Sequence, residues 1–361
     1  MQKKRATIKD VASLAGVSTA TVSHVVNGSK PVKQTVHDRV IAAARQLDYQ
    51  ADRAASQLRS GQTRVVAILV PDLDDAFFTS LVSRLEVMAG KDGFDVIVAS
   101  SRDDPAVEQS RLRALLGWRP AGMVVVPCTD SLPTVLIEEC GRTPVVLADR
   151  VVPAGAPADT VTIDNAEAGE IAARHLVAMG HRDVVIAASN LAIAPIRERE
   201  RGAHDFLRGA TGRAPVTIEL GSNSITGAER FAHWQERHAR PTAVLALTNV
   251  TTLAVLSALA QARVDIPEQV SVIGFDDYAW MSARKTALTA IRQPLDLMAQ
   301  SVWDRLTARM GGETGAPVAI SLTASLQVRD SVLGLPAIGG GDVATPGSDP
   351  LNPGESKSAI H

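Results

Sequence analysis

The sequence has little cysteine and few aromatic residues, and both shortages narrow the class of protein. Its two cysteines, Cys128 and Cys140, are too few and too isolated for a disulfide framework or a cysteine zinc site. We expect both to be structural thiols. Aromatic residues make up only 3% of the 361 positions, which disfavours an aromatic-rich recognition sandwich.

Long apolar runs are also missing. No stretch approaches the roughly 18 to 20 apolar residues that a membrane helix needs. The first ten residues, MQKKRATIKD, contain no apolar segment that resembles a signal sequence. We therefore expect a soluble, globular, cytoplasmic protein with no membrane contact. Its length is sufficient for two or three domains.

Charge is distributed unevenly along the chain. Residues 1–64 contain eleven Lys or Arg, four Asp and no Glu, a net charge of +7. The remaining residues carry −9, which brings the whole chain to −2. A basic head on an acidic body indicates that binding of a polyanion is confined to the head, although a small solvated helical domain can carry this charge by chance.

Residues 7–28 have the pattern of two short helices joined by a tight turn. Thr7 followed by Asp10 forms a capping-box pattern, which predicts the start of the first helix. Gly16 ends that helix and Ser18 can cap the second, while apolar residues at helical spacing give each helix one inward face. The pattern therefore predicts a helix-turn-helix.

Two further segments complete the basic region. Apolar residues at helical spacing predict a third amphipathic helix over residues 34–47, which would share one small core with the first two. Residues 53–59, with the sequence RAASQLR, are too short for a helix that is stable in isolation. We interpret them as a hinge that becomes ordered when something packs against it, or otherwise as a linker.

Beyond residue 64 the pattern changes to short apolar runs that alternate with amphipathic helical stretches. Continuous Val and Ile runs are typical of strands buried on both faces of a parallel sheet. The predicted strands are residues 65–70, 94–99, 122–127, 144–148, 183–187, 242–247 and 270–275. The pattern restarts after residues 161–165, which predicts two similar α/β lobes with a cleft between them. The Gly-, Pro- and Ser-rich stretch from Leu335 onward is expected to be a disordered tail.

The second helix of the head carries the residues that would read DNA. In a helix-turn-helix this helix enters the major groove, and its N-terminal residues meet the base edges. Thr19, Ala20 and His24 have outward positions and chemistry that suits base or phosphate contacts. Residues expected to cap, support or touch phosphates are Thr7, Ser18, Thr21, Ser23 and Asn27. The alternative is a solvent-exposed polar helix face.

Several stretches together carry a family resemblance. They are TIKDVASLAGVSTATVSHVVNG, RAASQL, DAFFTSLVSRLE, VVLADR, GHRDVVIA, PTAVLALTN and VSVIGFDD. In this order and at these intervals they resemble the LacI/GalR family of bacterial transcriptional regulators, from Thr7 to about Ser331. The first stretch is highly specific, and the others are individually weak but strong when taken together.

The resemblance implies how the head and hinge bind DNA. A homodimer, or a tetramer built from dimers, would place two heads on the half-sites of a near-palindromic operator in double-stranded DNA. The paired hinges would enter the minor groove, where Leu58 would wedge into the central base step and kink the duplex. Arg53, Ala55 and Gln57 would flank it. The alternative is that Leu58 packs within a linker.

The resemblance also implies an effector site like that of periplasmic sugar-binding proteins, at the carboxyl ends of the strands. The residues carried over are Phe77, Phe78, Asp149, Arg150, Arg199, Asn249 and Asp276. One of the two phenylalanines would stack on the ligand. An arginine with two aspartates and an asparagine suits a sugar, whereas the two arginines together suit a sugar acid or another carboxylate or phosphate. The alternative for each polar residue is a salt bridge at the edge of the cleft or a strand cap.

We therefore expect an α/β protein with an N-terminal helix-turn-helix three-helix head, a hinge helix, and a periplasmic-binding-protein-like pair of doubly wound parallel lobes. The expected boundaries are 1–50 for the head, 51–64 for the hinge, 65–334 for the effector-binding and dimerisation domain, and 335–361 for the tail. No cofactor, metal or catalysis is expected, because the phosphate-binding, metalloprotease and nucleophile motifs are missing. The function expected is an allosteric repressor, and the alternative is an effector-independent regulator with a degenerate pocket.

Overall fold

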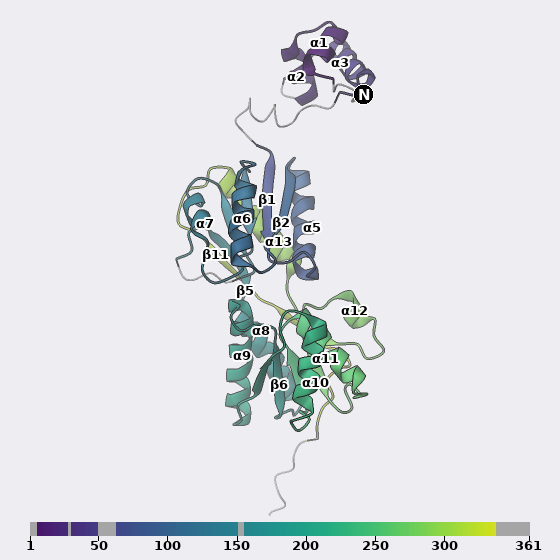
Figure 1. Cartoon of the computed structure of the whole chain (residues 1–361), viewed down its shortest axis with the longest axis vertical. Coiled ribbons are helices and arrows are strands. Elements are labelled where there is room, and N and C mark those ends of the chain that lie inside the picture. The colour runs from purple at the N-terminus through teal and green to yellow at the C-terminus, as the bar shows by residue number, and fades with distance from the viewer. Residues whose placement is uncertain (1–5, 28–29, 50–62, 151–154, 337–361) are drawn as a thin grey trace, which may run out of the picture. The chain divides into compact units, whose positions relative to one another are not determined.

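A computed structural model describes residues 6–27, 30–49, 63–150 and 155–336 (Figure 1). These residues form a small helical head and two compact α/β lobes. The predicted hinge residues Arg53, Ala55, Gln57 and Leu58 lie outside the described residues. Within the described ranges, no helix is both long and apolar enough to span a membrane.

The head contains helices α1 (Ile8–Ala15), α2 (Thr19–Asn27) and α3 (Gln34–Gln46). The capping box predicted at the start of α1 is confirmed, since the backbone N–H of Thr7 donates to the Asp10 carboxylate at 2.8 Å. Gly16, with a φ of +61°, ends α1 in the left-handed region, as predicted.

The three helices of the head share one core. Val22 and Val25 on α2 pack in the same cluster as Val11 on α1 and Val40 on α3, and all four are buried. At the turn before α2, the Ser18 hydroxyl accepts a hydrogen bond from the backbone N–H of Thr21 at 3.1 Å, so the predicted cap is also confirmed. The predicted helix-turn-helix is therefore formed.

The first lobe is built on a six-stranded sheet with the order β11-β5-β4-β3-β1-β2, in which every pairing is parallel. Its strands are β1 (Val65–Val70), β2 (Asp95–Ser100), β3 (Gly122–Val125), β4 (Val145–Ala148), β5 (Asp159–Ile163) and β11 (Ala319–Leu322). Its helices are α5 (Ala76–Lys91), α6 (Pro105–Leu116), α7 (Thr134–Glu139) and α13 (Leu295–Met310).

Alternation along β1 shows why this sheet needs helices on both faces. Ala67 and Leu69 pack in one cluster with Leu112 of α6 and Leu136 of α7. The intervening residues of β1 point to the opposite face and are buried too. Helices α5 and α13, which contact each other, supply the second layer. The continuous apolar run of β1 thus follows from burial on both faces.

The second lobe repeats this architecture, with the sheet order β12-β10-β9-β8-β6-β7. Its strands are β6 (Val184–Ala188), β7 (Val216–Glu219), β8 (Ala243–Ala246), β9 (Ser271–Phe275), β10 (Thr289–Arg292) and β12 (Ser325–Gln327), of which β12 runs antiparallel to β10. Its helices are α8 (Asn165–Ala178), α9 (Ala194–Thr211), α10 (Ser224–Gln235), α11 (Asn249–Gln261) and the short α12 (Ala279–Ser282). Helices α10 and α11 pack beside each other and cover one face.

The seven predicted strands are confirmed, with ends that shift by two residues at most. The prediction of two similar lobes is confirmed as well, but the lobes are not two successive segments. The chain returns to the first lobe for Pro294–Leu322 and re-enters the second at Thr323. The described part of the chain runs to Pro336, two residues past the boundary expected for the tail.

Candidate functional site

The outward surface of α2 in the head holds the residues predicted to read DNA. Thr19 and Ala20 are exposed in its first turn, and His24, one turn further along, is half-buried. Backbone N–H groups of the first turn of a helix carry a partial positive charge, which favours phosphate oxygens nearby. An exposed first turn with small side chains permits close approach to a nucleic-acid groove.

Three of the residues predicted to support this surface make hydrogen bonds at the starts of α1 and α2. The hydroxyls of Ser18 and Thr21 are 2.9 Å apart, and the Thr7 hydroxyl donates to the Asp10 carboxylate at 2.7 Å. Ser23 is half-buried on α2, and Asn27 is the last residue of that helix. Thr7, Ser18 and Thr21 therefore hold the ends of the two helices in place.

In the first lobe, Phe77 and Phe78 lie at the start of α5, just after β1. The Asp75 carboxylate caps this helix by accepting from the backbone N–H of Phe77 at 2.9 Å. The two rings meet edge to face with centroids 5.3 Å apart, and both side chains are buried. The guanidinium of Arg150 lies 6.0 Å from the centroid of Phe78. The structure therefore brings Phe78 and Arg150 together.

Arg150 is held by groups from the ends of neighbouring strands. Its guanidinium donates to both carboxylate oxygens of Asp103, at 2.6 and 3.2 Å, and to the backbone carbonyl of Cys128 at 2.8 Å. Asp103 follows β2, Cys128 follows β3 and Arg150 follows β4. Since these parallel strands share one carboxyl edge, the three residues converge there.

Beneath Arg150 lies a buried polar cluster that the sequence did not predict. The Glu108 carboxylate accepts from the backbone N–H of Cys128 at 2.9 Å, and the Cys128 thiol contacts the Ser101 hydroxyl at 2.8 Å. Burial raises the pKa of Glu108 above its usual range, and burial raises the pKa of the Cys128 thiol to about 12. The pKa of Cys140 is raised to about 11 for the same reason, so both thiols stay protonated at neutral pH.

In the second lobe, Arg199 is almost completely buried, with 4% of its surface exposed. Its Nε donates to the Asn165 amide oxygen at 2.8 Å, and its Nη1 donates to the backbone carbonyl of Leu247 at 3.0 Å. The guanidinium lies 4.0 Å from the centroid of Phe275, a cation–π contact. Arg199 is thereby fixed at the carboxyl ends of β8 and β9.

Asp276 and Asn249 form a second polar group at the same edge. One carboxylate oxygen of Asp276 accepts from the backbone N–H of Asn249 at 3.2 Å, and the other accepts from the Gln293 amide at 2.6 Å. The Asn249 amide donates to the Tyr278 hydroxyl at 3.2 Å. Asp276 directly follows Phe275, the last residue of β9. Because the Arg199 guanidinium packs on the ring of Phe275, it lies next to the group formed by Asp276 and Asn249.

The backbone at the strand ends is strained in both lobes. Asp149, directly after β4, has a φ of +60°, and Asp276, directly after β9, has a φ of +78°. Non-glycine residues rarely adopt this left-handed region, and those that do cluster at binding sites. Each lobe thus holds an aspartate in an unfavourable conformation where the sheet ends.

Two glycines bring Arg199 and Asn165 together. At Gly169 on α8, an added Cβ would lie 1.9 Å from the Arg199 carbonyl oxygen, and at Gly202 on α9 it would lie 1.9 Å from that of Ala166. The two helices therefore cross in backbone contact, which only glycine permits. Because Asn165 is on α8, this crossing sets its distance to Arg199.

The residues missed from the sequence are Asp103, Cys128, Asn165, Tyr278 and Gln293. No local pattern marked Gln293, which follows Arg292 at the end of β10. Asn165 begins a helix and was not marked either. The first-lobe group Phe77, Phe78, Asp149 and Arg150 and the second-lobe group Arg199, Asn249 and Asp276 belong to separate units.

The three-helix head, the two α/β lobes and the polar groups at their strand ends define a helix-turn-helix protein with a two-lobed α/β domain. Two family models match: bacterial regulatory proteins of the lacI family over residues 7–52, and the periplasmic binding protein-like domain over residues 173–332. The chain belongs to the LacI family of bacterial regulatory proteins, and it is a DNA-binding transcriptional regulator.

Individual relatives match along most of both chains. The transcriptional regulator PtxS of Pseudomonas putida is 30% identical over 91% of this chain and 96% of its own. The transcriptional repressor PurR of Vibrio vulnificus is 29% identical over 91% and 98%.

Two solved structures show the same similarity. A Lac repressor dimer bound to operator and the anti-inducer ONPF is 26% identical, with a TM-score of 0.81 over 91% of this chain and all of its own. A complex of the transcriptional regulator CelR with cellobiose is 28% identical, with a TM-score of 0.66 and the same coverage.

Proposed function

We propose that the chain is a cytoplasmic, non-catalytic repressor that binds a near-palindromic operator as a homodimer and is controlled by a small polyhydroxylated effector. The single observation that carries this proposal is the presence, in one chain, of an exposed first turn on α2 and a buried arginine among polar groups at the strand ends of a sensor lobe. The operator-bound dimer and the cellobiose complex among the similar structures support both parts.

The roles of the head residues follow from their positions. Thr19, Ala20 and His24 contact base edges, because they lie along the outer face of α2 from its first turn. Residues 51–64 form the hinge between the head and the sensor, in which Leu58 inserts into the minor groove. The residues that position α2 on the DNA and touch phosphates are Thr7, Ser18, Thr21, Ser23 and Asn27.

The effector is a sugar or a sugar acid. Arg199 with Asn249 and Asp276 offers donors and acceptors at fixed positions, which can match several hydroxyls or a carboxylate. In the first lobe, Phe78 supplies an apolar face, while Arg150 and Asp149 supply polar contacts. The bidentate pairing of Arg150 with Asp103 makes Arg199 the stronger candidate for a ligand carboxylate.

Selection of bound sites from random DNA, followed by a panel of sugars and sugar acids, tests the function. We expect a two-fold symmetric site and an effector that changes the affinity for it. At one position of each half-site, Thr19→Ala should change the difference in binding free energy between the preferred base and the other bases by about 1–3 kcal/mol. Thr35→Ala, an exposed threonine in the first turn of α3, is the matched control and should leave base preference unchanged. An asymmetric or sequence-independent site would overturn the proposal.

A further inference from the structure

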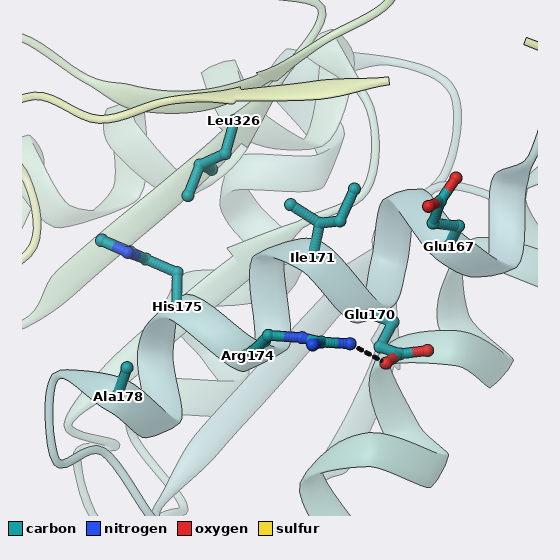
Figure 2. A pocket seen from close by; sticks show the side chains of 7 residues that line it. All are labelled: Glu167, Glu170, Ile171, Arg174, His175, Ala178 and Leu326. Atoms are coloured by element: carbon teal, nitrogen blue, oxygen red, sulfur yellow. Dashed lines mark hydrogen bonds and ion pairs between the residues drawn. The ribbon is translucent and has the colours of Figure 1, made fainter. Parts of the chain in front are cut away.

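A groove runs along α8 in the second lobe. Its volume is about 570 Å³, and it is lined by Glu167, Glu170, Ile171, Arg174, His175 and Ala178 of α8 and by Leu326 of β12 (Figure 2). The six helical residues recur at intervals of three and four, so they form one face of α8.

The groove has an apolar floor and a charged rim. Ile171 of α8 and Leu326 of β12 are half-buried and lie on opposite sides of the groove, as Figure 2 shows. On the rim, Arg174 pairs with Glu170 and lies 5.4 Å from the ring centroid of Phe206. Arg174 is also largely exposed, so its charge is accessible to an anionic group.

His175 adds a neutral polar group to this floor. Burial lowers the pKa of its imidazole, so the ring is uncharged at neutral pH. Its Nε2 is buried and has no hydrogen-bond partner among the described residues.

The chain itself leaves the lobe beside this groove. The backbone N–H of Leu335 donates to the carbonyl of Met179, the residue directly after α8, at 2.8 Å. The Leu335 carbonyl would lie 3.0 Å from a Cβ at Gly180. Ala178, at one end of the groove, is therefore next to the point where residues 337–361 begin.

The length and chemistry of the following segment suit the groove. Twenty-five residues follow Pro336, beginning AIGGGDV. The lined face of α8 is about 16 Å long at about 1.5 Å per residue, which five extended residues of about 3.3 Å each can span. Ile338 and Val343 are apolar, and Asp342 is the first charged residue after the exit.

We propose that residues 337–343 of this chain dock in the groove on α8. In this arrangement Ile338 or Val343 covers Ile171 and Leu326, and Asp342 pairs with Arg174. The attachment at Leu335 keeps the segment at a local concentration on the order of 1 mM, so even a weak contact is occupied.

Thiol labelling at Ala178→Cys tests this docking. The labelling rate at position 178 is measured by mass spectrometry in the full chain and in a chain that ends at Pro336. We expect labelling roughly tenfold slower in the full chain, for a contact with a Kd near 0.1 mM at that local concentration. Ala210→Cys, on the exposed end of α9, is the matched control and should label equally in both chains. Equal rates at position 178 would overturn the proposal.

Two further measurements identify the occupant. Arg174→Glu should speed labelling at position 178, and adding Asp342→Arg should slow it again. Arg208→Glu, which removes a similar exposed helical ion pair with Asp205 on α9, should have no effect. Protection that fades on dilution would mean that a second copy fills the groove, and failure of the charge exchange would mean that residues 337–343 do not; either result contradicts the proposal.

Discussion

The contacts of Arg199 require the planar shape of its guanidinium as well as its positive charge. Its guanidinium donates in two directions, to Asn165 and to the Leu247 carbonyl, and a lysine ammonium cannot serve both acceptors from one position. Arg199→Lys should therefore weaken effector binding by roughly 10- to 100-fold, about 1.5–3 kcal/mol for lost charged hydrogen bonds. Calorimetry measures the effector affinity, and fluorescence anisotropy measures operator affinity, which should change by less than about twofold without effector.

The matched control for Arg199 is Arg208→Lys on the same helix, where the side chain is exposed and pairs only loosely with Asp205. This variant should behave as the parent chain does. If Arg199→Lys bound effector with parental affinity, the role of the arginine would be structural only, and the assignment of the site would be wrong. Loss of both effector and operator binding would indicate misfolding instead.

Asp159 makes a residue-scale prediction about stability. Its side chain is fully buried and accepts from Arg309 at 2.6 and 3.0 Å, from Arg305 at 2.9 Å and from the backbone N–H of Val318 at 2.8 Å. Burial alone would raise its pKa, but the hydrogen bonds from Arg309, Val318 and Arg305 lower the pKa of Asp159 overall. Asp159→Asn should lower the free energy of unfolding by about 3–5 kcal/mol at neutral pH, because it leaves two arginines without their buried partner.

The pH dependence of Asp159 follows from the direction of its pKa. A carboxyl whose folded pKa is depressed contributes stability that is complete above its unfolded pKa of about 4 and is lost as the pH falls through the folded value. Urea unfolding of the parent should therefore lose stability below about pH 4, and Asp159→Asn should lose less over that range. Asp296→Asn, whose exposed carboxylate pairs with Arg84, is the control and should cost at most about 1 kcal/mol.

At the scale of elements, the crossing of α8 and α9 determines the geometry of the second lobe. An added Cβ at Gly169 or Gly202 would overlap a backbone carbonyl of the other helix, and backbone cannot rotate aside as a side chain can. Gly169→Ala and Gly202→Ala should each destabilise the lobe by about 1–3 kcal/mol or more and weaken effector binding, because the helices must separate and move Asn165 from Arg199.

Gly209, also on α9, provides the control for that crossing. No atom lies within 4 Å of a Cβ added there, so Gly209→Ala should stabilise the chain by about 0.5–1 kcal/mol through its better helix propensity. Thermal unfolding of the three variants distinguishes crowding from propensity. Equal effects of all three substitutions would contradict a close helix crossing.

The elements that could be predicted from the sequence are those with one strong pattern. Strands β1, β3, β4, β6, β8 and β9 are buried along their whole length and appear as continuous apolar runs. The edge strands β7, β11 and β12 contain exposed residues and are only three or four residues long, so their composition resembles that of loops. Their pairing depends on neighbours far away in the chain, which no local pattern records.

At the scale of the whole molecule, the path of the chain was the least predictable feature. The first lobe takes α13 and β11 from Pro294–Leu322, after the second lobe is nearly complete. The family resemblance marked Arg150 and Arg199 as site residues, but nothing in the sequence marked Asp103 and Asn165, which hold them. Those two partners come from other elements, and only the fold places them beside the arginines.

The proposed coupling between sensor and head makes a prediction for the whole molecule. An effector that changes operator affinity by some factor must have its own affinity changed by the operator by the same factor, typically about 5- to 150-fold. If the hinge transmits this coupling, Leu58→Ala should weaken operator binding and bring both factors close to one, while the intrinsic effector affinity stays unchanged. Anisotropy titrations of operator with and without effector, and calorimetry of effector with and without operator, measure the two factors independently.

Ser60→Ala, in the same segment but outside the residues proposed to touch DNA, is the matched control and should retain the full coupling. Equality of the two factors in the parent chain is required by thermodynamics and checks the measurement itself. Full coupling together with unchanged operator affinity in Leu58→Ala would mean that the signal reaches the head by contacts other than a wedge in the minor groove. A variant that loses operator affinity but keeps the coupling would assign Leu58 to DNA bending alone, because bending changes the affinity of both effector states equally.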